Sequence, residues 1–454
     1  MDVIVIDTPQ LGDRSYLVHD GEAALVIDPQ RDIDRVEKTA AELGVRITHV
    51  AETHMHNDYV TGGYVLAQNA GAAYLVNADD PVSFDRQPIT DGETVRVGSM
   101  LVKAVATPGH THTHLSYIVT SGDQQAVFSG GSLLYGSVGR TDLVSADDTV
   151  TLTHQQYASV RRLVEEAGRE AALYPTHGFG SFCSSGPSTG AAASTVAEQL
   201  ESNHALTDPD VEHFVQELIA NLTAYPSYYA HMAPSNIRGP EAANLVVPES
   251  IDPDELTRRL LDEEWVVDLR HRVAYASNHL EGTVSVEYGD GSNFTTYLGW
   301  LFPWGQDLTL VGDREDVENA IRDLSRIGID SPDVAVGADP TALAPRSRTA
   351  SYPRTDWAGL LADRPEDETV LDVRRTDEHE ASHLSGSKNI PLHELLTRLD
   401  EVPAGRLWVH CASGYRAGIA SSLLQRAGFD PVHIDARFAE AAEAGVELLS
   451  DRRS

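Results

Sequence analysis

The stretch Thr53-His54-Met55-His56-Asn57-Asp58 decides how the first half of this chain is interpreted. It follows a strand-like apolar run, so the side chains at 54, 56 and 58 alternate and project to one side of an extended segment. Two more histidines stand at turns, one after Pro108-Gly109 and one before Gly178. Imidazole and carboxylate groups gathered in this way form sites for zinc or iron. The sequence therefore predicts a metal site made of His54, His56, Asp58, His110 and His177. The alternative is that these are surface or core histidines without a metal.

Short apolar runs separated by turns surround these motifs, with helical periodicity at 33–43, 156–167 and 211–222. Many strands with intervening helices predict two sheets covered by helices, over residues 1–240. Two proline-rich breaks, 234–253 and 337–353, then separate the rest of the chain into segments 250–338 and 354–454. Each of these has the size of a small α/β domain.

Segments 250–338 and 354–454 look like copies of one domain. The first contains Val266-Val267-Asp268-Leu269-Arg270 and then His279-Leu280-Glu281-Gly282. The second contains Val370-Leu371-Asp372-Val373-Arg374 and then His383-Leu384-Ser385-Gly386, at the same spacing. We interpret the pair as a duplicated domain.

The last segment contains a cysteine between a buried strand, 407–411, and a helix, 417–427. The loop reads Cys411-Ala412-Ser413-Gly414-Tyr415-Arg416. The N–H groups at the start of a helix, together with Arg416, should stabilise an anionic sulfur on Cys411. An inert buried cysteine is the alternative. In the other copy Asp313 stands at the corresponding place, and because a carboxylate cannot carry sulfane sulfur, we expect that copy to be inactive.

The net charge of -35, from 69 acidic and 34 basic residues, excludes nucleic acid and anionic membranes as expected partners. No apolar run approaches the ~18 residues of a membrane span. Two cysteines in contrasting contexts exclude a disulfide scaffold, and the acidic N-terminus is unlike an export signal. We expect a cytoplasmic protein that forms a homo-oligomer.

The histidine motifs, with Thr107-Pro108-Gly109-His110 and Pro175-Thr176-His177-Gly178, resemble those of the metallo-β-lactamase superfamily. The segment Gly139-Arg140-Thr141-Asp142-Leu143 is similar to persulfide dioxygenases of that superfamily. The resemblance implies an αβ/βα sandwich and an iron(II) that serves the oxidation of glutathione or coenzyme A persulfide. It implies His54, His110 and an aspartate as ligands.

Two positions depart from that pattern. Tyr59 replaces a histidine of the first motif, which favours one metal over two. Gly131 stands where the family has a metal-binding aspartate, so the two-histidine, one-carboxylate set for oxygen chemistry is incomplete. His54, His56 and His110 could hold zinc instead, or Asp58 could supply the missing carboxylate. An aspartate placed at 131 is expected to restore iron binding.

Residues 354–454 resemble a rhodanese domain, and 250–338 resembles a degenerate second one. The loop of four residues between Cys411 and Arg416 is typical of sulfur transfer, with Cys411 as nucleophile. The whole arrangement is similar to fusions of a persulfide dioxygenase with a sulfurtransferase. It implies an enzyme of sulfane-sulfur metabolism that acts on a low-molecular-weight persulfide or thiosulfate. A zinc thioester hydrolase of the glyoxalase II kind and a non-enzymatic persulfide carrier or sensor are the alternatives.

Overall fold

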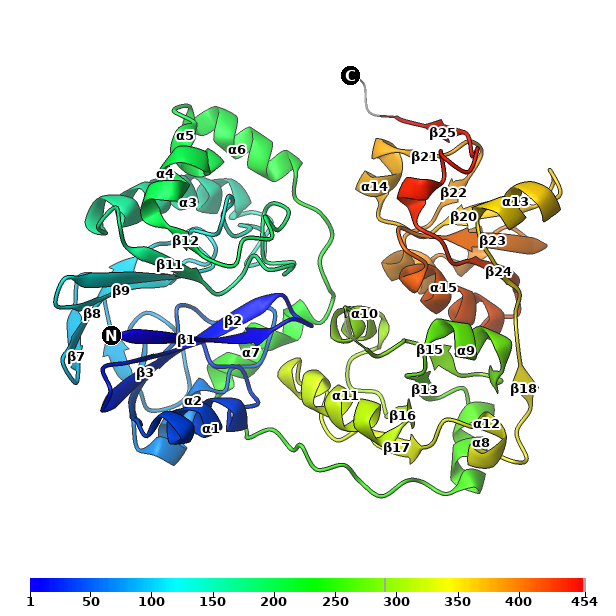
Figure 1. Ribbon diagram of the computed structural model, residues 1–454, viewed down its shortest axis with the longest axis horizontal. Helices are drawn as coiled ribbons and strands as arrows, with labels where there is room; N and C mark the ends of the chain where they lie inside the picture. Colours follow the sequence, from blue (N-terminus) through cyan, green and yellow to red (C-terminus); the bar gives the residue numbers. More distant parts are fainter. Residues whose placement is uncertain (290, 452–454) are drawn as a thin grey trace. The chain divides into compact units, whose positions relative to one another are not determined.

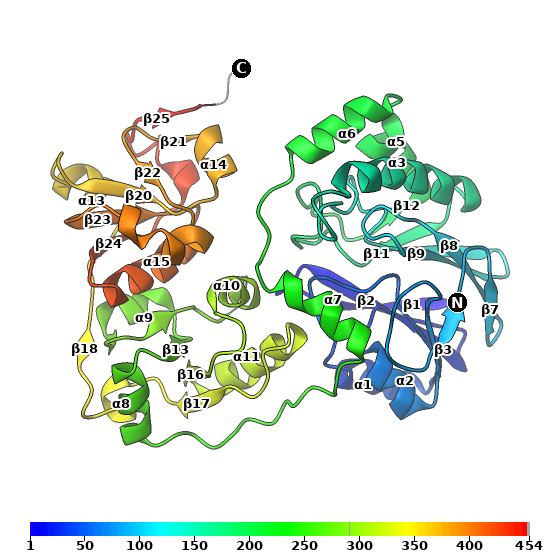
Figure 2. The same ribbon diagram turned by 180° about the vertical axis from the view of Figure 1, so that it is seen from behind.

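The computed structural model describes residues 1–289 and 291–451. They divide into two units, of which the first is Met1–Asn244 with Ser325–Gly328 and the second is Leu245–Leu324 with Ile329–Ser454. Figure 1 shows the first unit from blue to green and the second from green to red, and Figure 2 shows the same units from behind. Each unit is described by itself.

The first unit contains a six-stranded sheet built from the N-terminal strands in sequence order. The first two neighbouring pairs in this order are antiparallel, and the remaining three pairs are parallel. The strands are β1 (Asp2–Thr8), β2 (Asp13–His19), β3 (Ala23–Ile27), β4 (Arg46–Ala51), β5 (Ala73–Asn77) and β6 (Gln87–Ile89). Helices α1 (Asp34–Leu43), α2 (Gly63–Ala70) and α7 (Tyr229–Arg238) belong to this half of the unit.

A second six-stranded sheet, in the order β12-β11-β10-β9-β8-β7, completes the first unit. Its strands are β7 (Thr94–Val97), β8 (Met100–Ala106), β9 (Leu115–Ser121), β10 (Gln124–Gly130), β11 (Ala172–Pro175) and β12 (Ser194–Thr195). Its helices are α3 (Thr149–Glu166), α4 (Val196–Ser202), α5 (His204–Thr207) and α6 (Val211–Ala220).

Three apolar clusters fix the layer order of the first unit. One cluster joins the inner faces of the two sheets, for example Leu25 with Phe128. Separate clusters pack α1 and α2 on the first sheet and α3 and α6 on the second. The result is the predicted αβ/βα sandwich, with sheets inside and helices outside (Figure 1).

The candidate metal residues follow the ends of strands that terminate at one edge of this sandwich. His54 follows β4, His110 follows β8, and His177 follows β11. Strands β8 and β10 both pair antiparallel with β9, and β10 pairs parallel with β11. Strands β8, β10 and β11 therefore end at the same edge, which brings loops from distant parts of the sequence together.

The first half of the second unit has a parallel sheet of order β15-β13-β16-β17. The strands of this half are β13 (Trp265–Asp268), β14 (His279–Leu280), β15 (Val284–Ser285), β16 (Leu308–Gly312), β17 (Asp333–Val336) and β18 (Thr349–Ala350). Strands β14 and β18 pair with each other, antiparallel, outside the parallel sheet. Its helices are α8 (Pro253–Leu261), α9 (Arg272–Ser277), α10 (Phe294–Leu301), α11 (Arg314–Arg326) and α12 (Pro340–Leu343).

The second half repeats this design with the parallel sheet β19-β24-β23-β20-β22. The strands of this half are β19 (Arg354–Thr355), β20 (Thr369–Asp372), β21 (His383–Leu384), β22 (Lys388–Asn389), β23 (Arg406–His410), β24 (Asp430–Ile434) and β25 (Leu448–Leu449). Strands β21 and β25 pair with each other, antiparallel, outside the parallel sheet. Its α-helices are α13 (Trp357–Asp363), α14 (Thr376–Ala381) and α15 (Tyr415–Arg426), with short 3-10 turns at Leu392–Thr397, Leu399–Glu401 and Phe438–Glu440.

The motifs shared by the two halves make matching contacts. Arg270 pairs with Asp268 at 2.6 Å, and Arg374 pairs with Asp372 at 2.6 Å. The multi-domain α/β class is confirmed, whereas the boundaries 1–240, 250–338 and 354–454 stay a prediction. Within the described residues, none of the helices has the length and apolar character needed to cross a bilayer.

Candidate metal centre and cysteine loop

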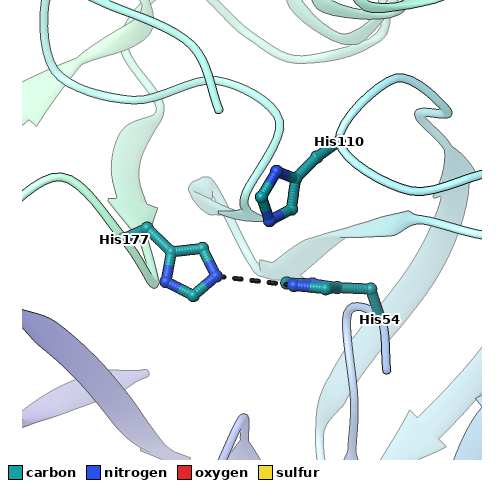
Figure 3. A group of neighbouring side chains, drawn as sticks. All are labelled: His54, His110 and His177. Atoms are coloured by element: carbon teal, nitrogen blue, oxygen red, sulfur yellow. Dashed lines mark hydrogen bonds between the residues drawn. The ribbon is translucent and has the colours of Figure 1, made fainter. Parts of the chain in front are cut away.

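Three of the predicted metal residues converge at the edge of the sandwich. His54, His110 and His177 are buried, and one ring nitrogen of each lies within 4.8 Å of the others. Figure 3 shows the three rings facing one another, with His177 Nε2 3.4 Å from His54 Nε2. They come from three separate loops, so the cluster exists only in the folded sandwich.

The Nδ1 atoms of these histidines are held by hydrogen-bond acceptors. His110 Nδ1 donates to the Arg140 carbonyl at 2.7 Å, and His177 Nδ1 donates to Asp13 Oδ1 at 2.8 Å. His54 Nδ1 lies 2.9 Å from Thr53 Oγ1, whose own proton goes to the buried Asp28. In the rings of His54 and His110 this places the proton on Nδ1 and leaves a lone pair on Nε2, and hydrogen bonds of this kind from the outward ring nitrogen are typical of metal-binding histidines.

The electrostatics of the cluster fit a cation. Burial lowers the pKa of His54 well below its ordinary value and lowers the pKa of His110 to about 3, so both rings are neutral. Against the same burial, the carboxylates of Asp58 and Asp13 raise the pKa of His177. Within the part of the chain that the structure describes, His110 Nε2 has no hydrogen-bond partner although it is buried. An unpaired buried nitrogen among neutral imidazoles and carboxylates suits a divalent transition metal.

His56 and Asp58 form a second group with His177, again with ligand atoms within 4.8 Å of one another. The structure therefore brings all five predicted metal residues into one buried cluster. The histidine triad differs from the predicted alternative of His54, His56 and His110, because its third member is His177 and not His56.

The environment of His56 explains this difference. Its Nε2 atom lies 2.9 Å from the Tyr59 hydroxyl and 3.3 Å from carboxylate oxygens of both Asp28 and Glu52. Although burial opposes the charge, these two carboxylates raise the pKa of His56 to about 9. Tyr59, which replaces the family's histidine, thus serves as a hydrogen-bond partner of His56.

Other residues that organise the site carry no sequence motif. Asp28, at a positive φ of 51°, accepts hydrogen bonds from the Thr53 N–H and the Thr176 hydroxyl and so joins two of the ligand loops. Asn236 of α7 donates to the carbonyls of His56 and Tyr59 at 3.0 and 2.9 Å. No pattern in the sequence points to Asp13 or Asp28.

Gly131 and Gly139 leave room for the His110 ring. A Cβ atom at 131 would lie 2.2 Å from His110 Cδ2, and one at 139 would lie 2.0 Å from the Gly131 carbonyl oxygen. The ring therefore occupies the space where a side chain at 131 would begin. Nearby His114 accepts a hydrogen bond from the Gly131 N–H at 3.0 Å.

Segment 139–143, which resembles persulfide dioxygenases in sequence, holds the His110 ring in place. Arg140 is buried and forms a two-pronged ion pair with Asp142 at 2.7 and 2.8 Å. Its guanidinium also donates to the carbonyls of Phe182 and Thr223. The Arg140 carbonyl, which accepts from His110, is thereby fixed.

The cysteine loop lies between β23 and α15, as the sequence predicts. Cys411 Sγ is buried and accepts a hydrogen bond from the Gly414 N–H at 3.1 Å. Gly414 has a positive φ of 90°, which turns its N–H toward the sulfur at the start of α15. The geometry suits a negatively charged sulfur.

Arg416 is engaged differently from the sequence expectation. Its guanidinium binds both oxygens of Glu378, at 2.6 and 2.8 Å. The charge of Arg416 is therefore balanced by a carboxylate. The hydrogen bond to Cys411 Sγ comes from the Gly414 N–H. The adjacent cavity of about 490 Å³ is lined by both halves of the unit, including Arg272, Asn293, Tyr297, Ser413, Arg416 and Arg437.

Comparisons with known proteins match the two parts of the chain that contain these sites. The family model described as the metallo-beta-lactamase superfamily matches residues 11–178, and the rhodanese-like domain model matches 356–436. The human protein named persulfide dioxygenase ETHE1, mitochondrial, is 28% identical over 229 residues, which are 49% of this chain and 83% of that protein. An atrochrysone carboxyl ACP thioesterase of Emericella nidulans is 30% identical over 37% of this chain and 52% of its own length.

A solved structure covers more of the chain. A metallo-beta-lactamase from Staphylococcus aureus is 26% identical with a TM-score of 0.66, over 74% of this chain and 98% of that one. The chain thus carries a metallo-β-lactamase superfamily domain with persulfide dioxygenase homologues, followed by a C-terminal rhodanese-like domain. Because no second rhodanese match is found, the degenerate copy at 250–338 stays a prediction.

Proposed function

We propose that this protein is an enzyme of sulfane-sulfur metabolism that processes a low-molecular-weight persulfide and transfers sulfur through Cys411. The observation that carries the proposal is the Gly414 N–H held at 3.1 Å from Cys411 Sγ in a rhodanese-like domain. The second support is a buried histidine cluster in a domain related to persulfide dioxygenases.

The Cys411 loop supplies the groups that take part directly in sulfur transfer. The Cys411 thiolate attacks the outer sulfur of thiosulfate, and sulfite leaves with the electron pair of the sulfur–sulfur bond. Cys411 is left as an anionic persulfide, which the Gly414 N–H and the positive end of α15 stabilise. An acceptor such as cyanide then takes the outer sulfur as thiocyanate and regenerates the thiolate. Arg416, at the end of this loop, is held by its ion pair with Glu378.

The size of the adjacent cavity bears on the sulfur donor. A volume of about 490 Å³ lies in the usual range for ligands of drug size, whereas thiosulfate has five heavy atoms. This supports glutathione or coenzyme A persulfide as the natural sulfur donor.

In the first unit His54, His110 and His177 would hold a divalent metal, with Asp58 as the nearby carboxylate. When bound, iron would supply redox chemistry toward oxygen, and zinc would supply Lewis-acid chemistry. Asp13, Thr53 and the Arg140 carbonyl keep the ring protons on Nδ1.

A second candidate function is thioester hydrolysis with zinc. Three imidazole nitrogens without a carboxylate in the triad are the pattern of a hydrolytic zinc site, and a thioesterase is among the relatives. Metal analysis of protein purified without oxygen, followed by oxygen consumption with glutathione persulfide and hydrolysis of a glutathione thioester, separates the two. A protein that retains neither iron nor zinc supports the carrier or sensor.

The test of sulfur transfer is Cys411→Ser. A hydroxyl has nearly the shape of a thiol, so folding and metal content should match the wild type, while thiocyanate formation from thiosulfate and cyanide should stop. Asp313→Ala, at an exposed position of the first half, is the control and should leave the rate unchanged. Thiocyanate formation by Cys411→Ser at the wild-type rate would contradict the proposal.

A further inference from the structure

The half of the second unit without a cysteine makes close contacts with the Cys411 loop. Arg272, at the start of α9, donates from Nε to Asp435 Oδ1 at 2.8 Å and from Nη1 to Glu287 Oε2 at 2.8 Å. Asp435 follows β24 in the other half, beside the cysteine loop. The Arg272 guanidinium therefore joins the two halves at the active loop.

Asp435 packs directly on the glycine that contacts the sulfur. A Cβ atom at Gly414 would lie 2.1 Å from Asp435 Oδ1, so the carboxylate rests against the Gly414 backbone. His433, two residues earlier, donates from Nε2 to the Gly414 carbonyl at 2.9 Å. The orientation of Gly414, and with it the N–H that faces Cys411, depends on where Asp435 lies.

The same half also holds the next residue of the loop. The Tyr415 hydroxyl donates to the main-chain carbonyl of Glu287 at 3.0 Å, and the Glu287 side chain is bound by Arg272. Farther along α15, Ser422 accepts from the Ser285 N–H, and Gln425 bonds His279 at 2.8 Å. Helix α15 is thus supported by the first half at its first turn and along its length.

We infer that Arg272 is a positioning residue for Cys411: through Asp435 and Glu287 it fixes the Gly414 N–H against the sulfur. The half without a cysteine would then serve sulfur transfer as the support that sets the geometry of the loop. The inference rests on the proposed transfer function, but its geometric part concerns Cys411 alone.

The test compares Arg272→Gln with Arg348→Gln in the full chain. Arg348 is in the same half, is largely exposed, and pairs with Glu281. Arg348→Gln is therefore a matched control that also removes one paired arginine. Arg272→Gln should lower the kcat of thiocyanate formation about tenfold, the size expected for the loss of one charged hydrogen bond. It should also shift the alkylation of Cys411 by iodoacetamide, followed on its peptide by mass spectrometry, to higher pH. Arg348→Gln should change neither.

A double variant separates positioning from charge. Loss of Arg272 leaves Asp435 paired with Arg354 alone, at 3.1 Å, and makes the surroundings of the loop more negative by one charge, which by itself would disfavour a thiolate. Arg272→Gln with Asp435→Asn removes both charges, so an electrostatic effect would disappear, whereas a positioning effect would remain. A wild-type alkylation profile in the double variant or in Arg272→Gln would overturn the inference.

The two hypotheses fail separately. A wild-type protein that forms no thiocyanate contradicts the proposed transfer, and the alkylation profiles still decide the role of Arg272. If Arg272→Gln does not fold, as judged by circular dichroism, Asp435→Ala removes the same contact from the other side, because alanine has no acceptor for Arg272 Nε. Asp435→Ala should then shift the profile, and an unchanged profile overturns the inference.

Discussion

Gly131 offers a sharp test of how the metal centre is built. The family pattern predicts that aspartate at this position restores a metal ligand. The structure reverses that expectation, because the first side-chain atom would lie 2.2 Å from His110 Cδ2 and 2.7 Å from its Nε2. Even Gly131→Ala must push the His110 ring out of its place.

The cost can be estimated from what the ring would lose. Overpacking a buried site costs about 1–3 kcal/mol. Displacing the ring also breaks the 2.7 Å bond from His110 Nδ1 to the Arg140 carbonyl, worth about 1 kcal/mol. We expect Gly131→Ala and Gly131→Asp to destabilise the protein by about 2–4 kcal/mol and to lower metal content.

The assay is thermal unfolding by circular dichroism, with metal content measured by mass spectrometry after anaerobic purification. Each kcal/mol should lower the unfolding midpoint of the first unit by roughly 2–4 °C. Gly168→Ala is the control, because its Cβ would meet only the end of the Gln125 side chain, at 3.0 Å. Higher iron content in Gly131→Asp than in the wild type would refute this reasoning and show that the His110 ring can move to make room for the new side chain.

Three further predictions concern other contacts. Arg416→Ala leaves Glu378 with only its contacts to Arg375 beside the cysteine loop, so thiocyanate formation should fall at least about tenfold, and adding Glu378→Gln should recover part of it. Asn236→Ala removes a buried amide that bonds the backbone of the His56 loop, so urea unfolding should show a loss of about 3 kcal/mol, and metal content should fall. Burial raises the pKa of Asp80 to about 6, so the folded state gains a proton that the unfolded state lacks and stability falls as pH rises from about 4 to above 6. Asp80→Asn should therefore stabilise the protein by up to about 3 kcal/mol at pH 8 and have no effect at pH 3, as measured by urea unfolding at both pH values.

Local patterns in the sequence were enough for the fold class and for most candidate residues. The alternation of His54, His56 and Asp58 depends only on neighbours in the chain, as does the strand, glycine turn and helix around Cys411. The turns before His110 and His177 likewise mark strand ends. These features follow from backbone geometry over a few residues, so they can be recognised without knowing how distant segments pack.

The tertiary structure decided which of these groups meet and what holds them. That His177 completes the triad while His56 pairs with Asp28 and Glu52 depends on how loops from two sheets converge. The same holds for the His110 ring that fills the space at Gly131. Contacts of this kind join residues far apart in the chain, and their distances are set by the packing of whole sheets, for which no local periodicity carries a signal.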